Sequence, residues 1–148
     1  MAEIDLSQSE ADGLIAMEKH RLTDDILSFP GPGQRLVIPL RSPDHRELFS
    51  LDVVRSSIKL TKGMFQNRAR QVIILLRLDV DGAPHRNPDG AEIPCPLLHV
   101  YREGYGDKWA VPAPLSLQPN DGKLYSVLAQ FMQHCNVTQQ PTVQEGLF

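Results

Sequence analysis

The residues best suited to chemistry are concentrated in one stretch of the chain, from Asp79 to Trp109. Its sequence is DVDGAPHRNPDGAEIPCPLLHVYREGYGDKW, and it holds two of the five histidines, one of the two cysteines and the only tryptophan. A long loop rich in proline, glycine, asparagine and aspartate leads into a short strand. Ordered loops of this kind commonly carry binding residues. We therefore expect the functional site to lie here.

Acid–base catalysis without a metal is the chemistry that these side chains suit best. Cleavage of RNA by its own 2′-hydroxyl requires a base, an acid, and cations that stabilise the charge on the phosphorane. Histidine exchanges protons near neutral pH, and arginine binds phosphate through two parallel hydrogen bonds. The candidate catalytic residues are His99, His85, Tyr101 and Arg77.

Each of these residues also has a structural explanation, and both readings stay open. His99 could hydrogen-bond within the sheet, Tyr101 could pack across strands, and His85 could cap the loop. Arg77 and Asp79 are two residues apart on one strand and so share a face. They could form a surface ion pair or a pair that lines a cleft. It is the co-occurrence of these residues that favours a functional site.

Metal, nucleophile and nucleotide-cradle chemistry fit the sequence less well. Possible ligands cluster in this stretch, but none has the paired spacing of a zinc site. A GxSxG elbow, a GxGxxG loop and a P-loop are all absent from the sequence. We therefore expect no metal and no cofactor. The scattered ligands are His85, Asp89, Glu92, Cys95 and His99.

A basic run precedes this stretch in a chain whose net charge is −3. From Arg55 to Arg86 there are seven cations and two acids. Such a run could bind phosphate groups, although it could also be the solvated face of a sheet. The residues predicted to bind nucleic acid or a partner are Arg55, Lys59, Lys62, Arg68, Arg70, Arg102, Tyr105, Lys108 and Trp109.

The length and composition are those of one globular domain, 1–148, with a core over about 6–136 and a loosely held tail at 137–148. The polar, acidic N-terminus is unlike a signal peptide, and no apolar run reaches the length of a membrane span. We expect a cytoplasmic protein without membrane contact. Two widely spaced cysteines predict no disulfide framework.

The apolar patterns predict an α+β fold in which an antiparallel sheet of about five strands is flanked by an N-terminal and a C-terminal helix. The first helix is expected over Ser7–Arg21, because Ser7 and Glu10 have capping-box spacing. The last is expected over 124–135, where apolar residues recur at helical spacing. Strands are expected at 35–41, 47–55, 72–80, 97–102 and 108–111, with the start of another at 57–60. The segment 62–71 has only weak periodicity.

Three segments resemble a family of small uncharacterised proteins from bacteria, phages and mobile elements. The most characteristic is PHRNPDGAEIPCPLLHVYREGYGDKWAVP; LSQSEADGLIAMEK and VIILLRLD also fit. The resemblance spans about residues 6 to 112 and implies no activity. It does imply a genomic setting in which toxins, antitoxins and inhibitors of host defence are common.

Two functional hypotheses follow. The first is an RNA-binding, metal-independent endoribonuclease-like domain of a mobile-element or toxin–antitoxin system. The second is a non-enzymatic protein-binding inhibitor of a host defence system, comparable to an anti-CRISPR phage accessory protein. The partner is therefore RNA or a protein, namely a cognate antitoxin or toxin or a defence complex. A homo-oligomer is compatible with either hypothesis.

Overall fold

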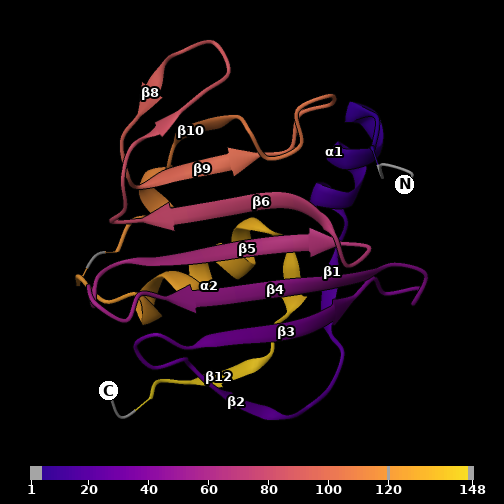
Figure 1. The fold of residues 1–148 in the computed structure, drawn as a ribbon. Coiled ribbons are helices and arrows are strands. Elements are labelled where there is room, and N and C mark those ends of the chain that lie inside the picture. Colours follow the sequence, from indigo (N-terminus) through magenta and orange to yellow (C-terminus); the bar gives the residue numbers. More distant parts are fainter. Residues whose placement is uncertain (1–4, 120, 147–148) are drawn as a thin grey trace.

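Strands make up most of the regular secondary structure, and two helices accompany them (Figure 1). The computed structural model describes residues 5–119 and 121–146. The helices are α1 (Gln8–Ala16) and α2 (Tyr125–His134), with a 3-10 turn, η1 (Leu115–Leu117). No helix in the described part is both long and apolar enough to cross a membrane. The strands are β1 (Lys19–Arg21), β2 (Ile26–Ser28), β3 (Arg35–Arg41), β4 (Leu48–Arg55), β5 (Gly63–Ala69), β6 (Ile73–Val80), β7 (His85–Arg86), β8 (Glu92–Ile93), β9 (Leu97–Val100), β10 (Ala110–Pro112), β11 (Val137–Gln139) and β12 (Thr142–Gln144).

The main sheet has eight strands in the order β10-β9-β6-β5-β4-β3-β1-β11. Neighbours are antiparallel except β1 and β11, which are parallel. Two small sheets, β2 with β12 and β7 with β8, lie beside it. The α+β class is therefore confirmed, whereas the expected five-stranded, fully antiparallel sheet is wrong.

Side chains alternate between the two faces of the main sheet, and the helices cover only one of them (Figure 1). The covered face carries apolar residues such as Leu51 and Phe65, which are buried. Phe131 of α2 packs against Phe65 with ring centroids 5.9 Å apart. The other face carries the outward positions, which we call the open face.

Helix α2 has the apolar stripe that its sequence predicts. Val127, Leu128, Phe131 and Met132 are all buried against the sheet. Cys135, just after the helix, is fully buried, and burial raises the pKa of its thiol to about 12. It is therefore a packing residue rather than a nucleophile.

Helix α1 begins as predicted but ends five residues early. Ser7 and Glu10 form the capping box, since each side chain accepts a hydrogen bond from the other residue's backbone amide. The helix stops at Ala16, and the expected last turn is instead strand β1. Pairing of β1 with β3 and β11 outweighs the helical pattern there.

Further strands form where none was expected from the sequence, namely β2, β5, β7, β8, β11 and β12. The weakly periodic segment 62–71 contains β5, which alternates regularly between buried and half-buried positions. The tail, expected to be loosely held, contributes β11 to the main sheet and β12 to a small one in its described part. Conversely, the predicted strand start at 57–60 is wrong, because these residues form the turn between β4 and β5.

A buried lysine joins the ends of the two helices. Lys19 has no solvent exposure, and its ammonium group donates to the carbonyls of Ile15, Met17 and Cys135 at 3.0, 2.9 and 2.8 Å. It also lies 4.8 Å from the ring centroid of Phe49. Burial lowers the pKa of Lys19 to about 8, so the group is still cationic at neutral pH. A cation at this place complements the negative ends of both helix dipoles.

We predict that Lys19→Met lowers the free energy of unfolding by about 3–5 kcal/mol, because three buried carbonyls lose their donor. Urea denaturation at pH 7 measures the change. The control is Lys123→Met, since the Lys123 side chain is 66 % exposed; a change within about 0.5 kcal/mol is expected there. Equal midpoints for Lys19→Met and the unmutated protein would contradict the role given to Lys19.

Candidate nucleic-acid interface

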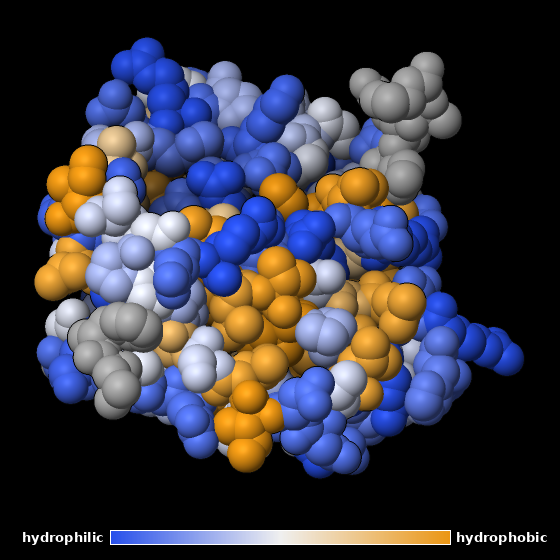
Figure 2. Space-filling model, turned by 60° about the horizontal axis from the view of Figure 1, so that its bottom comes forward, coloured by the Kyte–Doolittle hydropathy of each residue, from blue (hydrophilic) through white to orange (hydrophobic). Residues whose placement is uncertain are grey.

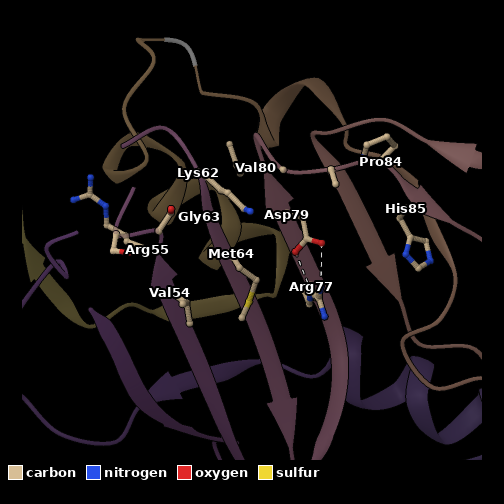
Figure 3. A pocket seen from close by; sticks show the side chains of 14 residues that line it. Val54, Arg55, Lys62, Gly63, Met64, Arg77, Asp79, Val80, Pro84 and His85 are labelled. Carbon is tan, nitrogen blue, oxygen red and sulfur yellow. Dashed lines mark hydrogen bonds and ion pairs between the residues drawn. The ribbon is translucent and has the colours of Figure 1, made fainter. Parts of the chain in front are cut away.

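A cavity of about 700 Å³ opens at one end of the main sheet, where β4 and β6 end and β5 begins. Figure 3 shows Met64 and Lys62 on the central strand and turn, with Arg77 and Asp79 beside them and His85 on the far side. Val54, Met64, Val80 and Pro84 give it apolar walls, and three cations and one acid provide its charge. The remaining lining residues are Arg55, Ser56, Ser57, Lys62, Gly63, Arg77, Asp79, Gly82, Ala83 and His85.

Arg77 and Asp79 form an ion pair inside this cavity, so both readings of the pair hold. The guanidinium donates to the carboxylate through Nε at 3.0 Å and Nη2 at 3.1 Å. Its Nη1 lies 3.7 Å from the carboxylate of Asp107. The hydrogen bond that Arg77 donates to Asp79, opposed by burial, raises the pKa of Arg77. The arginine is therefore held in place with most of its charge already balanced.

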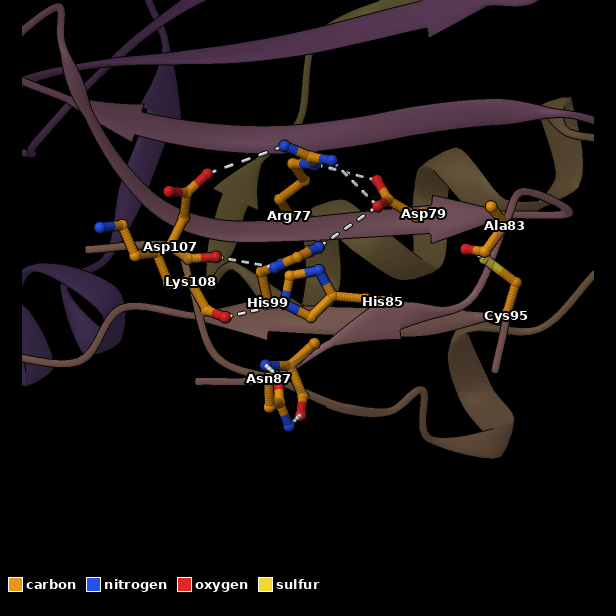
Figure 4. Close-up of polar contacts among 10 residues, drawn as sticks. Arg77, Asp79, Ala83, His85, Asn87, Cys95, His99, Asp107 and Lys108 are labelled. Carbon is orange, nitrogen blue, oxygen red and sulfur yellow. Dashed lines mark hydrogen bonds and ion pairs between the residues drawn. The ribbon is translucent and has the colours of Figure 1, made fainter. Parts of the chain in front are cut away.

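His99 is enclosed in the same network (Figure 4). Cross-strand pairing places it beside Arg77, and it is only 3 % exposed. Its Nδ1 lies 2.7 Å from the carbonyl oxygen of Asp107, and its Nε2 lies 3.3 Å from the carboxylate of Asp79. Both partners are oxygen acceptors, and the ring joins the Asp107 backbone to the Asp79 side chain. His99 is therefore buried within the network and fixed at both ring nitrogens.

The Asp79 carboxyl is the electrostatic centre of this cluster. Burial alone would raise its pKa, but the hydrogen bonds from His99 and Arg77 outweigh burial, and the pKa lies below its ordinary value. The carboxyl is therefore ionised at neutral pH, and it contacts both Arg77 and His99.

His85 is the histidine that solvent reaches. It is half-buried, and its ring lies 4.6 Å from the ring of His99 at an angle of 72°. Its Nε2 donates to the carbonyl oxygen of Lys108 at 2.7 Å. That carbonyl can only accept, so in the neutral ring the proton is on Nε2 and Nδ1 is the basic nitrogen. Within the described residues, Nδ1 has no hydrogen-bond partner.

The loop that carries His85 is fixed to the edge of the sheet by Asn87. This side chain is 6 % exposed, donates to the carbonyl of Ala110 at 2.9 Å and accepts from the amide of Ala110 at 2.8 Å. The Asn87 side chain thus makes the two hydrogen bonds with Ala110 of β10 that a neighbouring strand would otherwise make. The sequence showed the NPDG turn but gave no sign of this anchoring role, and Asp107 was likewise not expected at the site.

Tyr101, which was a candidate catalytic residue, does not line the cavity. Strand β9 ends at Val100, so the alternation stops before Tyr101. Its ring enters the core, and its hydroxyl lies 2.8 Å from the amide of Leu6 and 2.9 Å from the Leu6 carbonyl. Burial raises its pKa. Tyr101 therefore anchors the segment that leads into α1.

Two of the predicted cations line the cavity without a carboxylate partner among the described residues. Lys62 is exposed, and Arg55 donates to the carbonyls of Pro30 and Leu60 at 3.1 and 3.3 Å. The Nε of Arg55 is buried and has no partner in the described part. Lys59 lies nearby but is paired with Asp81 at 2.8 Å. Figure 3 shows the Arg55 guanidinium directed away from Lys62, Arg77 and Asp79, so the cation that faces the cavity without a carboxylate partner in the described part is Lys62.

Arg68 and Arg70 do not reach the cavity. Arg68 forms a salt bridge at 2.6 Å with Asp52, whose side chain has no solvent exposure. Arg70 pairs with Glu47 at 2.9 Å, where β4 begins and β5 ends. The Arg68 pair therefore lies in the middle of the sheet, and the Arg70 pair lies at the end opposite the cavity.

The four predicted residues of the β9–β10 turn lie close together, and Lys108 contacts His85. Arg102 covers the ring of Trp109, Tyr105 packs edge-on against the same ring, and Lys108 supplies the carbonyl that His85 contacts.

In the residues that the structure describes, no group of three or more His, Cys, Asp or Glu side chains could hold a metal ion.

We predict that Asp79→Asn destabilises the protein at pH 7 and that this difference shrinks in acid. The lowered pKa of Asp79 means that its carboxylate stabilises the fold above the ordinary value of 3.8 and that this contribution is lost as pH falls through the folded value. A loss of about 1–3 kcal/mol is expected at pH 7. Urea midpoints at pH 7 and pH 3 test this; a difference that does not depend on pH would contradict it.

One family model matches the chain, over residues 6–137, and its description is a family of unknown function, DUF6978. The match extends past the segments that suggested the resemblance and includes the pocket, both helices and the loop anchored by Asn87. No curated protein and no solved structure shows a significant match. Since the model covers most of the chain, the protein belongs to the DUF6978 family.

Proposed function

We propose that this protein binds RNA, with the phosphate backbone in the cavity at the end of the open face. The observation that carries the proposal is the charge of that cavity. Arg55 and Lys62 line it without carboxylate partners among the described residues, while Arg77 is held by Asp79. Cations that lack an internal partner attract phosphate, and binding releases the counterions of the RNA.

The apolar walls give the cavity a second property that suits a nucleotide. Val54, Met64 and Pro84 lie among the cations, so charged and apolar surfaces face the same space. A volume of about 700 Å³ lies within the range typical of small-molecule and cofactor sites. The proposal therefore includes at least one nucleotide unit in the cavity.

We further propose metal-independent cleavage with His85 as the base. Its Nδ1 takes the proton of the 2′-hydroxyl, the 2′-oxygen bonds to phosphorus, and the bond to the 5′-oxygen breaks. The 5′-oxygen takes a proton from water, which leaves a 2′,3′-cyclic phosphate and a 5′-hydroxyl. Lys62, which has no carboxylate partner among the described residues, lines the space in which the negative charge of the phosphorane would be stabilised, and Arg77 lines the same space while held by Asp79. The proposal implies that the substrate is cytoplasmic RNA. It also implies that the protein acts as part of a toxin–antitoxin system or a mobile element.

The second candidate function, a protein-binding inhibitor of host defence, is favoured by a different observation. Aliphatic side chains are unusually exposed at the turn beside the cavity, with Ile58 at 93 % and Leu60 at 64 %. Apolar side chains also gather in the middle of the surface in Figure 2, with polar side chains around them. Val37 and Leu48 on the sheet are among the exposed aliphatics. A protein partner, or a second copy of this chain, would bury such residues.

We predict that Lys62→Ala weakens the binding of single-stranded RNA about tenfold and lowers the salt slope of the logarithmic binding constant by about 0.7, because one phosphate contact is lost. Fluorescence anisotropy at several salt concentrations measures both quantities. Arg46→Ala is the control, because Arg46 is exposed in the turn at the opposite end of β4. Equal losses in both variants would contradict a site in the cavity. A protein that binds no RNA would favour the second candidate function.

We predict that His85→Ala abolishes RNA cleavage measured with EDTA present, because the base is lost, while RNA affinity changes less than threefold. The products are separated by gel and tested for a 2′,3′-cyclic phosphate. His45→Asn is the matched control; His45 is exposed in the β3–β4 turn with φ of 64°, which asparagine tolerates. Undiminished cleavage by His85→Ala would exclude His85 as the base. Binding without any cleavage by the unmutated protein would reduce the function to binding alone.

A further inference from the structure

The β9–β10 turn is a rigid, solvent-facing group of one cation and two aromatic rings. Arg102 and Gly106 exchange two backbone hydrogen bonds of 2.9 Å, which close the turn. The rings of Tyr105 and Trp109 lie 5.7 Å apart at 86°. The guanidinium carbon of Arg102 lies 4.3 Å from the centroid of the Trp109 ring. We call Arg102, Tyr105 and Trp109 the stacking platform.

Part of the stacking platform is exposed to solvent and could contact a ligand. Arg102 is exposed and forms no salt bridge within the described residues, so its charge is not balanced locally. One face of its guanidinium covers Trp109, which leaves the other face toward solvent. Tyr105 is 43 % exposed. The Nε1 of Trp109 is buried and has no hydrogen-bond partner in the described part.

The stacking platform and the cavity are joined through His85. His85 lines the cavity, and its Nε2 donates to the carbonyl of Lys108, which is the residue before Trp109. Asn87 holds the same loop to Ala110, the residue after Trp109. The two sites are therefore fixed relative to each other by hydrogen bonds on both sides of the tryptophan. The exposed side chain of Lys108 adds positive charge beside this junction.

We propose that the stacking platform binds an unpaired RNA base while the phosphate of a nearby nucleotide occupies the cavity. This inference rests on the proposed function and narrows it to single-stranded RNA. Aromatic rings and arginine planes stack on bases that are not paired, whereas bases inside a duplex offer no free face. The guanidinium group of Arg102 supplies a planar surface and a positive charge, and Tyr105 supplies an aromatic ring in addition to that of Trp109.

Trp109 is the only tryptophan, so its fluorescence reports directly on this platform. Titration with a single-stranded RNA oligonucleotide is expected to quench it. Tyr105→Ala is expected to weaken binding about tenfold, given about 1–3 kcal/mol per stacked base. Tyr105→Phe keeps a ring and should bind normally. Arg102→Lys keeps the charge but loses the plane, so it should weaken binding at unchanged net charge.

A ligand-side control separates stacking from charge. An oligonucleotide of equal length with abasic sites keeps its phosphates, so it should bind Tyr105→Ala and the unmutated protein equally. Single-stranded RNA that binds without quenching, and with equal affinity for Tyr105→Ala, would overturn the stacking platform but leave the proposed function intact. Failure of every RNA probe to bind, with anisotropy unchanged, would overturn both, and the stacking platform would then be open to a protein partner.

Discussion

The ammonium group of Lys19 is the contact on which the arrangement of helices and sheet depends. It donates hydrogen bonds to the carbonyls of Ile15 and Met17 at the end of α1 and to the carbonyl of Cys135 after α2. Both helices therefore end at one buried point. The amide of Lys19 bonds to the carbonyl of Asn136, which brings β1 next to β11. Two helices that end at one point beneath the sheet must lie on the same face of it. The other face is therefore left to the outward positions, and this is where the polar site forms.

The open face carries charge in two different ways. In the middle of the sheet, Arg68 and Asp52 satisfy each other, and Gln66 adds a hydrogen bond of 2.6 Å to the same carboxylate. Paired charges of this kind offset their own burial and have little left for a ligand. At the cavity, Arg55 and Lys62 find no such partner in the described part of the chain. Cations that face a carboxylate across the strands therefore stabilise the sheet, whereas cations without such a partner keep their charge available to a ligand.

Sequence patterns located the strands that are dense in aliphatic residues, and β3 was predicted with its observed bounds. They missed β5 because its inward positions include Gly63 and Asn67, so burial and apolarity do not coincide there. The pairing of Arg77 with Asp79 followed from spacing alone. The contact of His99 with Asp79 depends on the register between β6 and β9, and the position of Tyr101 depends on where β9 ends; both are set by tertiary structure and leave no mark in local sequence. Strand register is thus the limit of what the sequence could predict for this site.

The two histidines of the site differ in what their nitrogens can do. Both nitrogens of His99 face acceptors, and it has almost no solvent exposure, so it links Asp79 to the turn at Asp107. His85 is half-buried and lines the cavity, and of its two ring nitrogens only Nε2 has a hydrogen-bond partner in the described part. Because Asp79 also orients Arg77, the buried histidine and the arginine are positioned by one carboxylate. Of the two histidines, His85 is therefore the one that a ligand in the cavity can reach, and the hydrogen bonds of the loop fix the position of its ring.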